Sequence, residues 1–143
     1  MSEGAVFKKI VWASDGSASA DQALELAKAL ASDGATLLAV HSVEYLAGKG
    51  DIPLDAGEED MRAKIEGQVA ELAERGVNAT AKIVQGGFTG AARTVSRVAE
   101  EEGADLIVAG TRGHTQLGGL LLGSVTQRLL CIAPCPVLAV PTN

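Results

Sequence analysis

Short apolar runs alternate with longer amphipathic stretches along the whole chain. The apolar runs predict strands, at residues 7–13, 36–41, 77–84, 105–109 and 136–140. Between them, apolar residues recur at helical spacing, which predicts helices at residues 18–32, 61–75, 89–102 and 125–132. Strict alternation of strand and helix is typical of an α/β fold, in which helices cover both faces of a parallel sheet.

Local signals refine this pattern. Ser19, followed at a capping-box spacing by Gln22, predicts the start of the first helix. Residues 47–60 are polar and rich in glycine, so we expect a surface loop there. The third strand alternates apolar and polar residues, as an edge strand does. The helix faces expected to be buried consist of Leu24, Ala27, Leu30 and Ala31, then Met61, Ile65, Val69 and Leu72, then Ala92, Val95, Val98 and Ala99.

Composition and charge narrow the class of protein. The chain has 143 residues, the length of one ordinary domain, and with only 3% aromatic residues its core is expected to consist of Ala, Val, Leu and Ile. The formal net charge of −6 argues against nucleic acid and anionic membranes as partners, because both attract basic patches. The first residues lack the apolar stretch of a signal peptide, and no run has the length of a membrane span. We therefore expect a cytoplasmic protein.

The cysteines and histidines give no sign of a disulfide framework or a metal centre. Cys131 and Cys135 are too few for a disulfide scaffold, and their spacing is not that of a zinc site. We expect Cys131 to face the core from the last helix. His41, at the end of the second strand, is expected to be structural.

The order of the strands predicts where a ligand would bind. For a doubly wound sheet of five strands we expect the order 3-2-1-4-5, so the winding reverses between strands 1 and 4. Ligands of such sheets bind outside the carboxyl ends of the strands at this reversal. The loops that follow these two strands, residues 14–17 and 110–124, are therefore expected to form one crevice.

The second of these loops has the character of a phosphate cradle. Gly110, Gly113 and Gly123 punctuate it, and Ser124 follows at the expected start of the last helix. Glycines let backbone N–H groups approach an anion, and a helix N-terminus supplies unpaired donors and partial positive charge. Ser124 can serve as an N-cap and a phosphate contact at once. Arg112 has the right chemistry for phosphate, although its side chain can equally point to solvent.

Asp15 lies in the first loop and has two readings. It can simply end the strand and begin a turn, or it can contact a ligand at the reversal of winding. Beside phosphates a carboxylate is repelled unless it meets a hydroxyl or a cation. A ribose or Mg²⁺ is therefore the partner we expect for it.

These residues together resemble the universal stress protein family. Its nucleotide-binding members carry a glycine, two residues, a second glycine, nine residues, and a third glycine followed by Ser or Thr, and Gly110, Gly113, Gly123 and Ser124 fit this spacing. Asp15 after the first strand and the sequence around the last strand fit as well, so the resemblance spans nearly the whole chain.

The resemblance implies a Rossmann-like, three-layer sandwich similar to the adenine-nucleotide alpha hydrolases, which binds ATP and dimerises through its last strand. It implies that Asp15 bonds to the ribose or lies near the metal–phosphate end, and that backbone groups of Ala13 and Val40 flank adenine. The residues implied to hold the phosphates and ribose are Gly110, Gly113, Gly123, Ser124, Val125 and Thr126.

We expect from this a nucleotide-dependent stress-response switch that binds ATP with Mg²⁺ and acts on an unidentified protein partner. The chain lacks the lysine of a P-loop and the Rossmann glycine fingerprint, and no nucleophile–base pair can be named, so we expect no dedicated catalysis. A slow or partner-dependent ATPase, a cyclic AMP binder and a structural dimer without nucleotide remain alternatives. The apolar run at residues 136–140 favours a homodimer independently, because an uncovered strand edge invites pairing with a second copy.

Overall fold

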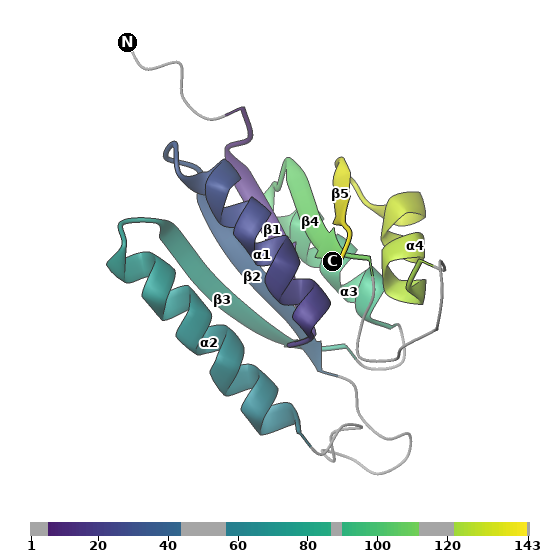
Figure 1. The fold of residues 1–143 in the computed structure, drawn as a ribbon. Coiled ribbons are helices and arrows are strands. Elements are labelled where there is room, and N and C mark those ends of the chain that lie inside the picture. The colour runs from purple at the N-terminus through teal and green to yellow at the C-terminus, as the bar shows by residue number, and fades with distance from the viewer. Residues whose placement is uncertain (1–5, 44–56, 87–89, 112–121, 143) are drawn as a thin grey trace.

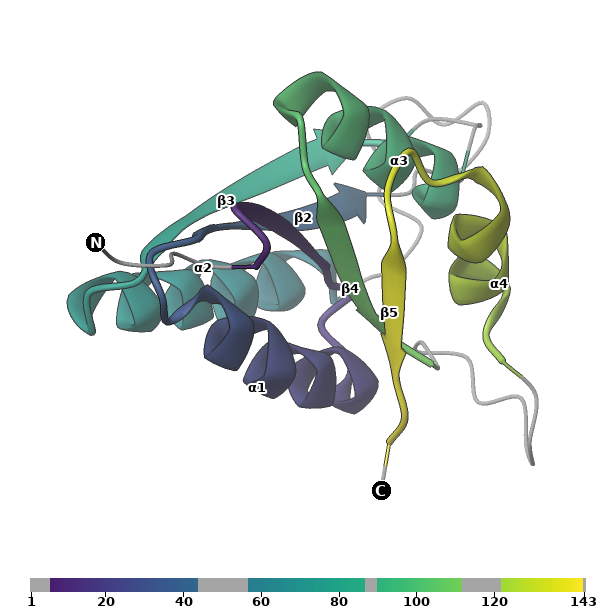
Figure 2. The same ribbon diagram turned by 90° about the horizontal axis from the view of Figure 1, so that it is seen from above.

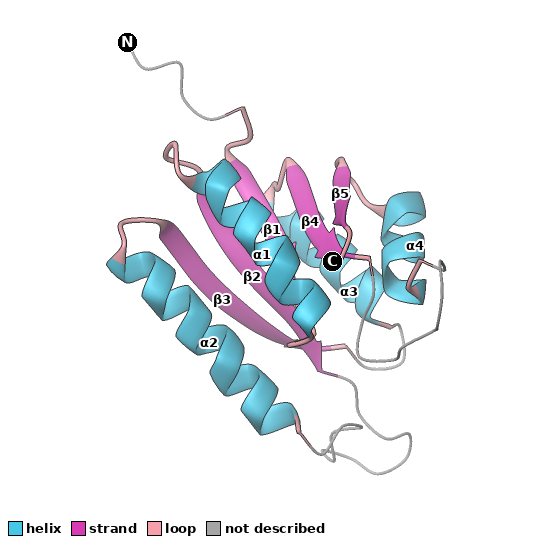
Figure 3. Ribbon diagram, viewed as in Figure 1, coloured by secondary structure: helices cyan, strands magenta, loops and turns pink. Residues whose placement is uncertain are grey.

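The expected strands and helices are all present in the computed structural model, which describes residues 6–43, 57–86, 90–111 and 122–142. Figure 1 traces them through the chain, and Figure 3 separates helices from strands by colour. In chain order the elements are β1 (Lys9–Ala13), α1 (Ala18–Ala31), β2 (Thr36–Val43), α2 (Glu58–Glu74), β3 (Asn78–Gln85), α3 (Ala91–Glu102), β4 (Leu106–Gly110), α4 (Ser124–Ile132) and β5 (Val137–Val140).

The sheet confirms the expected topology. Its five strands lie in the order β3-β2-β1-β4-β5, and each neighbouring pair is parallel. The weakly apolar β3 is an edge strand, as its alternating pattern predicts, and β5 is the other edge. The chain winds outward from β1 to β3 and then returns to place β4 beside β1. The reversal of winding therefore lies between β1 and β4.

Helices cover both faces of the sheet. Figure 2 shows α1 and α2 on one face and α3 and α4 on the other. Side chains of a strand point alternately to the two faces, so Trp12 packs with α1 and α2 whereas its neighbour Val11 packs with α3 and α4. The result is a three-layer α/β sandwich with a separate apolar core on each face.

Small aliphatic side chains build both cores, as the low aromatic content predicts. Two aromatic residues join them: Phe7 packs partly buried against one core, and Trp12 is fully buried there, with its indole Nε1–H donating to the carbonyl of Ala20 at 2.9 Å. The predicted helix faces are buried, with Leu30 and Met61 only partly so; the buried members are Leu24, Ala27, Ala31, Ile65, Val69, Leu72, Ala92, Val95, Val98 and Ala99.

An ionic cluster joins the end of α3 to β1 and β3. The carboxylate of Glu102 lies 3.2 Å from the ammonium of Lys9 and 3.4 Å from that of Lys82. Hydrogen bonds to these two lysines, and then their charges, hold the pKa of Glu102 below its ordinary value. The two ion pairs therefore link Glu102, the last residue of α3, to β1 and β3.

The first helix is capped differently from the prediction. Ser17, with extended backbone, is the N-cap, and its hydroxyl accepts from the N–H of Ala20 at 3.2 Å. Ser19 instead lies inside the first turn, buried, and its hydroxyl accepts from Thr142 at 2.9 Å. The capping box at Ser19 and Gln22 was therefore wrong, because Ser19 already has helical neighbours and packs against the sheet.

Two further predictions are corrected. The surface loop expected at residues 47–60 ends earlier, since Glu58 already begins α2; residues 47–56 lie outside the described part of the chain. Three acidic side chains in the first turn of α2 suit the partial positive charge of a helix N-terminus. Cys131, expected to face the core, is exposed, because the buried side of α4 is formed by Thr126 and Leu129.

Candidate functional site

The carboxyl ends of β1 and β4 lie side by side, and the predicted site residues surround them. Trp12 of β1 is in register with Val108 of β4, so Ala13 and Gly110, the last residues of these strands, end at the same edge of the sheet. The turn after β1 and the junction between β4 and α4 therefore meet at this edge. These are the two segments that the sequence places at the reversal of winding.

The turn after β1 is held in one shape by its own side chains. The carboxylate Oδ1 of Asp15 accepts from the N–H of Ser17 at 3.0 Å, and the hydroxyl of Ser14 accepts from the N–H of Gly16 at 3.1 Å. Gly16 has a φ of +80°, a conformation that disfavours every side chain. Asp15 thus has the turn-forming role predicted for it, and a ligand role at this edge stays a prediction.

Ala13 and Val40 form a register pair beside this turn. Val40 is fully buried, its side chain lies in the core under α3, and its carbonyl accepts from the N–H of Ser14 at 3.0 Å. Ala13 is partly buried next to the same core. Val40 lies three residues before the end of β2, and its carbonyl is already bonded to Ser14, so the contact of this pair with adenine stays a prediction.

The junction between β4 and α4 is closed by two hydrogen bonds, and a third joins it to the end of β5. The N–H of Gly123 donates to the carbonyl of Thr111 at 2.7 Å, and the N–H of Thr111 donates to Val140 at 3.1 Å. The hydroxyl of Thr126, itself buried, donates to the carbonyl of Gly110 at 2.6 Å. The structure thereby brings the two ends of the glycine loop together.

Residues 112–121 of that loop, which include the predicted site residues Arg112 and Gly113, lie outside the described part of the chain.

The start of α4 is suited to an anion. Gly123 is the N-cap, with φ −60° and ψ 151°, so Ser124 is the first helical residue and its expected role as N-cap was wrong. The first bond of the helix runs from the N–H of Gln127 to the carbonyl of Gly123. The N–H groups of Ser124, Val125 and Thr126 precede that bond and have no acceptor within the helix. They supply donors and partial positive charge beside the end of β4.

Gly110 has a packing role that the motif does not reveal. A Cβ at this position would collide with the hydroxyl of Ser19 and lie 2.7 Å from the carbonyl oxygen of the same residue. Gly86, after β3, is similarly confined, since its Cβ would collide with the hydroxyl of Ser42. The glycine at 110 therefore lets α1 approach β4, whatever it does for a ligand.

A buried pair that the sequence did not reveal lies beneath the turn after β1. His41, in β2, is only 3% exposed, and Glu58, in α2, is 6% exposed. The ring Nε2 of His41 lies 2.8 Å from Oε2 of Glu58, and Nδ1 lies 2.8 Å from the carbonyl oxygen of Ser14. The sequence signal for such a pair was a histidine on the apolar face of β2, because a buried imidazole requires polar partners. Its partner could not be named, since Glu58 was assigned to a loop.

Other chemical groups lie away from this edge. Burial, and then the charge of Asp105, raises the pKa of the Cys135 thiol.

The described ranges contain no group of three or more His, Cys, Asp and Glu side chains that could hold a metal ion. In the same ranges, no helix combines the length and the apolar character that crossing a bilayer requires.

Comparison with known proteins decides the family. The model of the universal stress protein family matches residues 7–141. The chain belongs to the universal stress protein family. The resemblance inferred from the glycine spacing is thereby confirmed.

Relatives extend this match to the whole length of the domain. This universal stress protein is 39% identical over 141 residues to the one in the QAH/OAS sulfhydrylase 3′ region of Thermus aquaticus, covering 94% of this chain and 99% of that protein. A crystal structure of a family member from Burkholderia pseudomallei is 34% identical, with a TM-score of 0.73 over 97% of this chain and 99% of the other. The hypothetical protein MJ0577 is 27% identical, with a TM-score of 0.77 and coverage of 95% and 96%.

Two structural neighbours contain a nucleotide. One is a universal stress protein in complex with cAMP, at 24% identity, a TM-score of 0.69 and coverage of 97% of this chain and 100% of the other. The second, from Archaeoglobus fulgidus, is in complex with dAMP, at 23% identity, a TM-score of 0.68 and coverage of 94% and 98%. At these identities the likeness establishes that the fold is shared.

Proposed function

We propose that this chain is a single nucleotide-binding domain that binds ATP with Mg²⁺ between β1 and β4 and acts as a nucleotide-dependent switch in a cytoplasmic stress response. The observation that carries the proposal is the closed junction between β4 and α4, which sets the start of α4, with three N–H groups that have no acceptor within the helix, beside the end of β4. The chain carries a net charge of −6, so an anionic ligand must be held by local donors of this kind.

Asp15 supplies the complementary chemistry on the other side of the crevice. One carboxylate oxygen accepts from Ser17 and fixes the side chain in the turn. A carboxylate in this place would bond to a ribose hydroxyl or join phosphate oxygens and water around Mg²⁺, an ion that prefers oxygen ligands and keeps much of its water. Asp15 would therefore orient the nucleotide, while the start of α4 would bind its phosphates.

The relatives support an adenine nucleotide in particular. Proteins of the same fold are known in complex with cAMP and with dAMP. The complex with cAMP makes cyclic AMP the second candidate ligand for the same crevice. A switch needs only that the nucleotide bind one conformation better than another, because that difference in affinity sets the shift in population. An unidentified protein partner would then read the favoured conformation.

We propose that the functional unit is a homodimer joined through β5. This strand is one edge of the sheet, and its Leu138 is 36% exposed. Leu130 and Ile132 of the adjacent α4 are also exposed, at 50% and 40%. An apolar edge strand flanked by apolar side chains favours pairing with a second copy. Light scattering of the wild type and of Leu138→Lys tests this: a monomeric wild type would overturn the proposal.

Calorimetry tests the ligand. ATP, ADP, cyclic AMP and adenosine are titrated into the purified protein with and without Mg²⁺, after mass spectrometry of any small molecule released on denaturation. We expect ATP to bind more tightly than adenosine, because only ATP reaches the donors of α4. Tighter binding of cyclic AMP would select the second candidate. Absence of binding by every adenine compound would overturn the proposal and favour a structural dimer.

Turnover is measured on the same samples. We expect phosphate release from ATP to be negligible, since no general base or P-loop lysine has been identified beside the crevice. Release that Asp15→Ala abolishes would instead establish the slow ATPase, whereas release that this change leaves untouched would come from a contaminant.

A further inference from the structure

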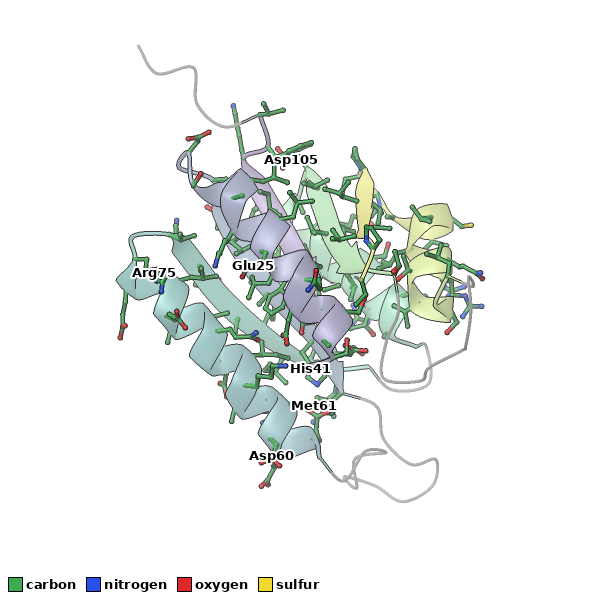
Figure 4. All side chains as sticks on the ribbon, in the orientation of Figure 1. Glu25, His41, Asp60, Met61, Arg75 and Asp105 are labelled. Carbon is green, nitrogen blue, oxygen red and sulfur yellow. The ribbon has the colours of Figure 1, made fainter. Side chains whose placement is uncertain are left out.

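A chain of buried hydrogen bonds runs from α2 through β2 to the turn that carries Asp15. Nε2 of His41 lies 2.8 Å and 3.0 Å from the two carboxylate oxygens of Glu58, and Nδ1 lies 2.8 Å from the carbonyl oxygen of Ser14. Figure 4 shows His41 at the carboxyl end of the sheet, close to the start of α2, where Met61 lies. This series of hydrogen bonds therefore ends at the carbonyl of Ser14, one residue before Asp15.

The chemistry of the three groups fixes the direction of these bonds. A carbonyl oxygen only accepts, so Nδ1 of His41 carries a proton and donates it to Ser14. Both carboxylate oxygens of Glu58 contact the opposite ring nitrogen, Nε2, which gives the buried imidazole a polar partner there. His41 is thus an oriented donor to the turn, and Glu58 is the group that orients it.

The other side of Asp15 is held by the same helix. The ammonium of Lys64 donates to the carbonyl of Gly16 at 2.9 Å and forms an ion pair with Asp21 at 2.8 Å. The side chain of Met61 packs on Gly16 so closely that a Cβ there would lie 3.0 Å from its Cγ. The carbonyls that precede and follow Asp15 are therefore both fixed, one by His41 and the other by α2.

We propose that His41 and Glu58 are positioning residues for nucleotide binding. They hold the Ser14 carbonyl, and with it the backbone of Asp15, in the conformation that meets the ligand. The inference rests on the proposed function, because the turn has a ligand to meet only if the crevice binds one. The pair also makes the docking of α2 a condition for tight binding.

Two substitutions of His41 separate its two bonds. The side-chain amide of Asn places its nitrogen near the position of Nδ1, so His41→Asn can keep the donor to Ser14. The longer Gln places its nitrogen near Nε2, so His41→Gln can keep the bond to Glu58 but loses the one to Ser14. Both leave a smaller side chain in the same buried place, and urea unfolding measures the stability that each loses.

Calorimetry with Mg·ATP then tests the role of the pair. We expect His41→Gln to weaken binding about tenfold, the effect of losing one organising hydrogen bond, and His41→Asn to retain most of the affinity. In an Asp15→Ala background, His41→Gln should change affinity less than about twofold, because the residue it positions is gone. Equal losses in both variants, or a tenfold loss that persists without Asp15, would show a merely structural role and overturn the proposal.

A measurement without ligand keeps the proposal testable on its own. Amide hydrogen exchange at Gly16 and Ser17 should speed up in His41→Gln beyond what its global stability explains, and stay near wild type in His41→Asn. Glu58→Gln, a milder change, should raise exchange at the same two amides. If the wild type fails to bind ATP, the proposed function fails, while unchanged exchange at these amides would refute the positioning itself.

Discussion

Replacing Ser124 by proline removes one backbone donor from α4 and leaves the helix intact. Ser124 is the first helical residue, and its N–H precedes the first bond of the helix, so the helix loses nothing when that N–H is absent. The preceding Gly123, with φ −60° and ψ 151°, already has the extended conformation that a following proline prefers. The change therefore tests the anion site with little effect on folding.

The size of the effect follows from the charge on the ligand. A hydrogen bond to a charged group contributes about 1.5–3 kcal/mol, so Ser124→Pro should weaken ATP binding roughly 10- to 150-fold. Ser124→Ala is the matched control, because it removes only the hydroxyl and keeps the N–H. Adenosine, which has no phosphate, should bind both variants and the wild type alike.

Calorimetry with ATP and adenosine reads out the comparison, and thermal unfolding confirms that both variants are folded. The reasoning is refuted if Ser124→Pro binds ATP within about twofold of Ser124→Ala, since one charged hydrogen bond is worth more than that. A loss shared equally by ATP and adenosine would mean that the proline ring disturbs the crevice itself.

Three further predictions are tested without a ligand. Gly110→Ala should lower the free energy of unfolding by about 1–3 kcal/mol in urea titrations, because its Cβ meets the backbone of Ser19; unchanged stability would contradict this packing. Glu102→Gln should be less stable than the wild type at pH 7, and the difference should vanish as the pH falls through the lowered pKa of Glu102, since protonation then removes its attraction for two lysines; a gap that persists in acid would exclude this cause. Iodoacetamide should label the exposed Cys131 before Cys135, whose raised pKa leaves less thiolate, and equal rates in peptide mapping would rule this out.

The topology could be predicted from the sequence because it depends on alternation, which the apolar pattern shows directly. The capping of α1 could not, since both Ser17 and Ser19 lie where a helix begins. Ser17 has the extended backbone of an N-cap, whereas Ser19 faces β4, and only the packing of α1 on the sheet decides between them.

The candidate site was predictable to the extent that it depends on glycine spacing and strand order. As expected, Gly110, Gly123 and Asp15 lie at one edge of the sheet, where β1 and β4 end. The contact of His41 with Glu58 was not predictable, because it depends on how α2 docks, and those two residues are separated by a segment whose pattern gave no helix start. The exposure of Cys131 was missed because the short α4 carries apolar residues on more than one side, so its apolar periodicity does not indicate a single buried face.

The bond between Gly123 and Thr111 has a consequence for how such a domain can diverge. It fastens the two ends of residues 112–122 to each other, and Thr126 fastens the start of α4 to the end of β4 independently of that segment. Most of the entropic cost of closing a loop comes from bringing its ends together, and this cost grows slowly with length. Because its ends are already joined, the segment tolerates changes of length and sequence. Residues 112–122 can therefore change during evolution to suit a new ligand while the hydrogen bonds of Thr111, Gly123 and Thr126 stay the same.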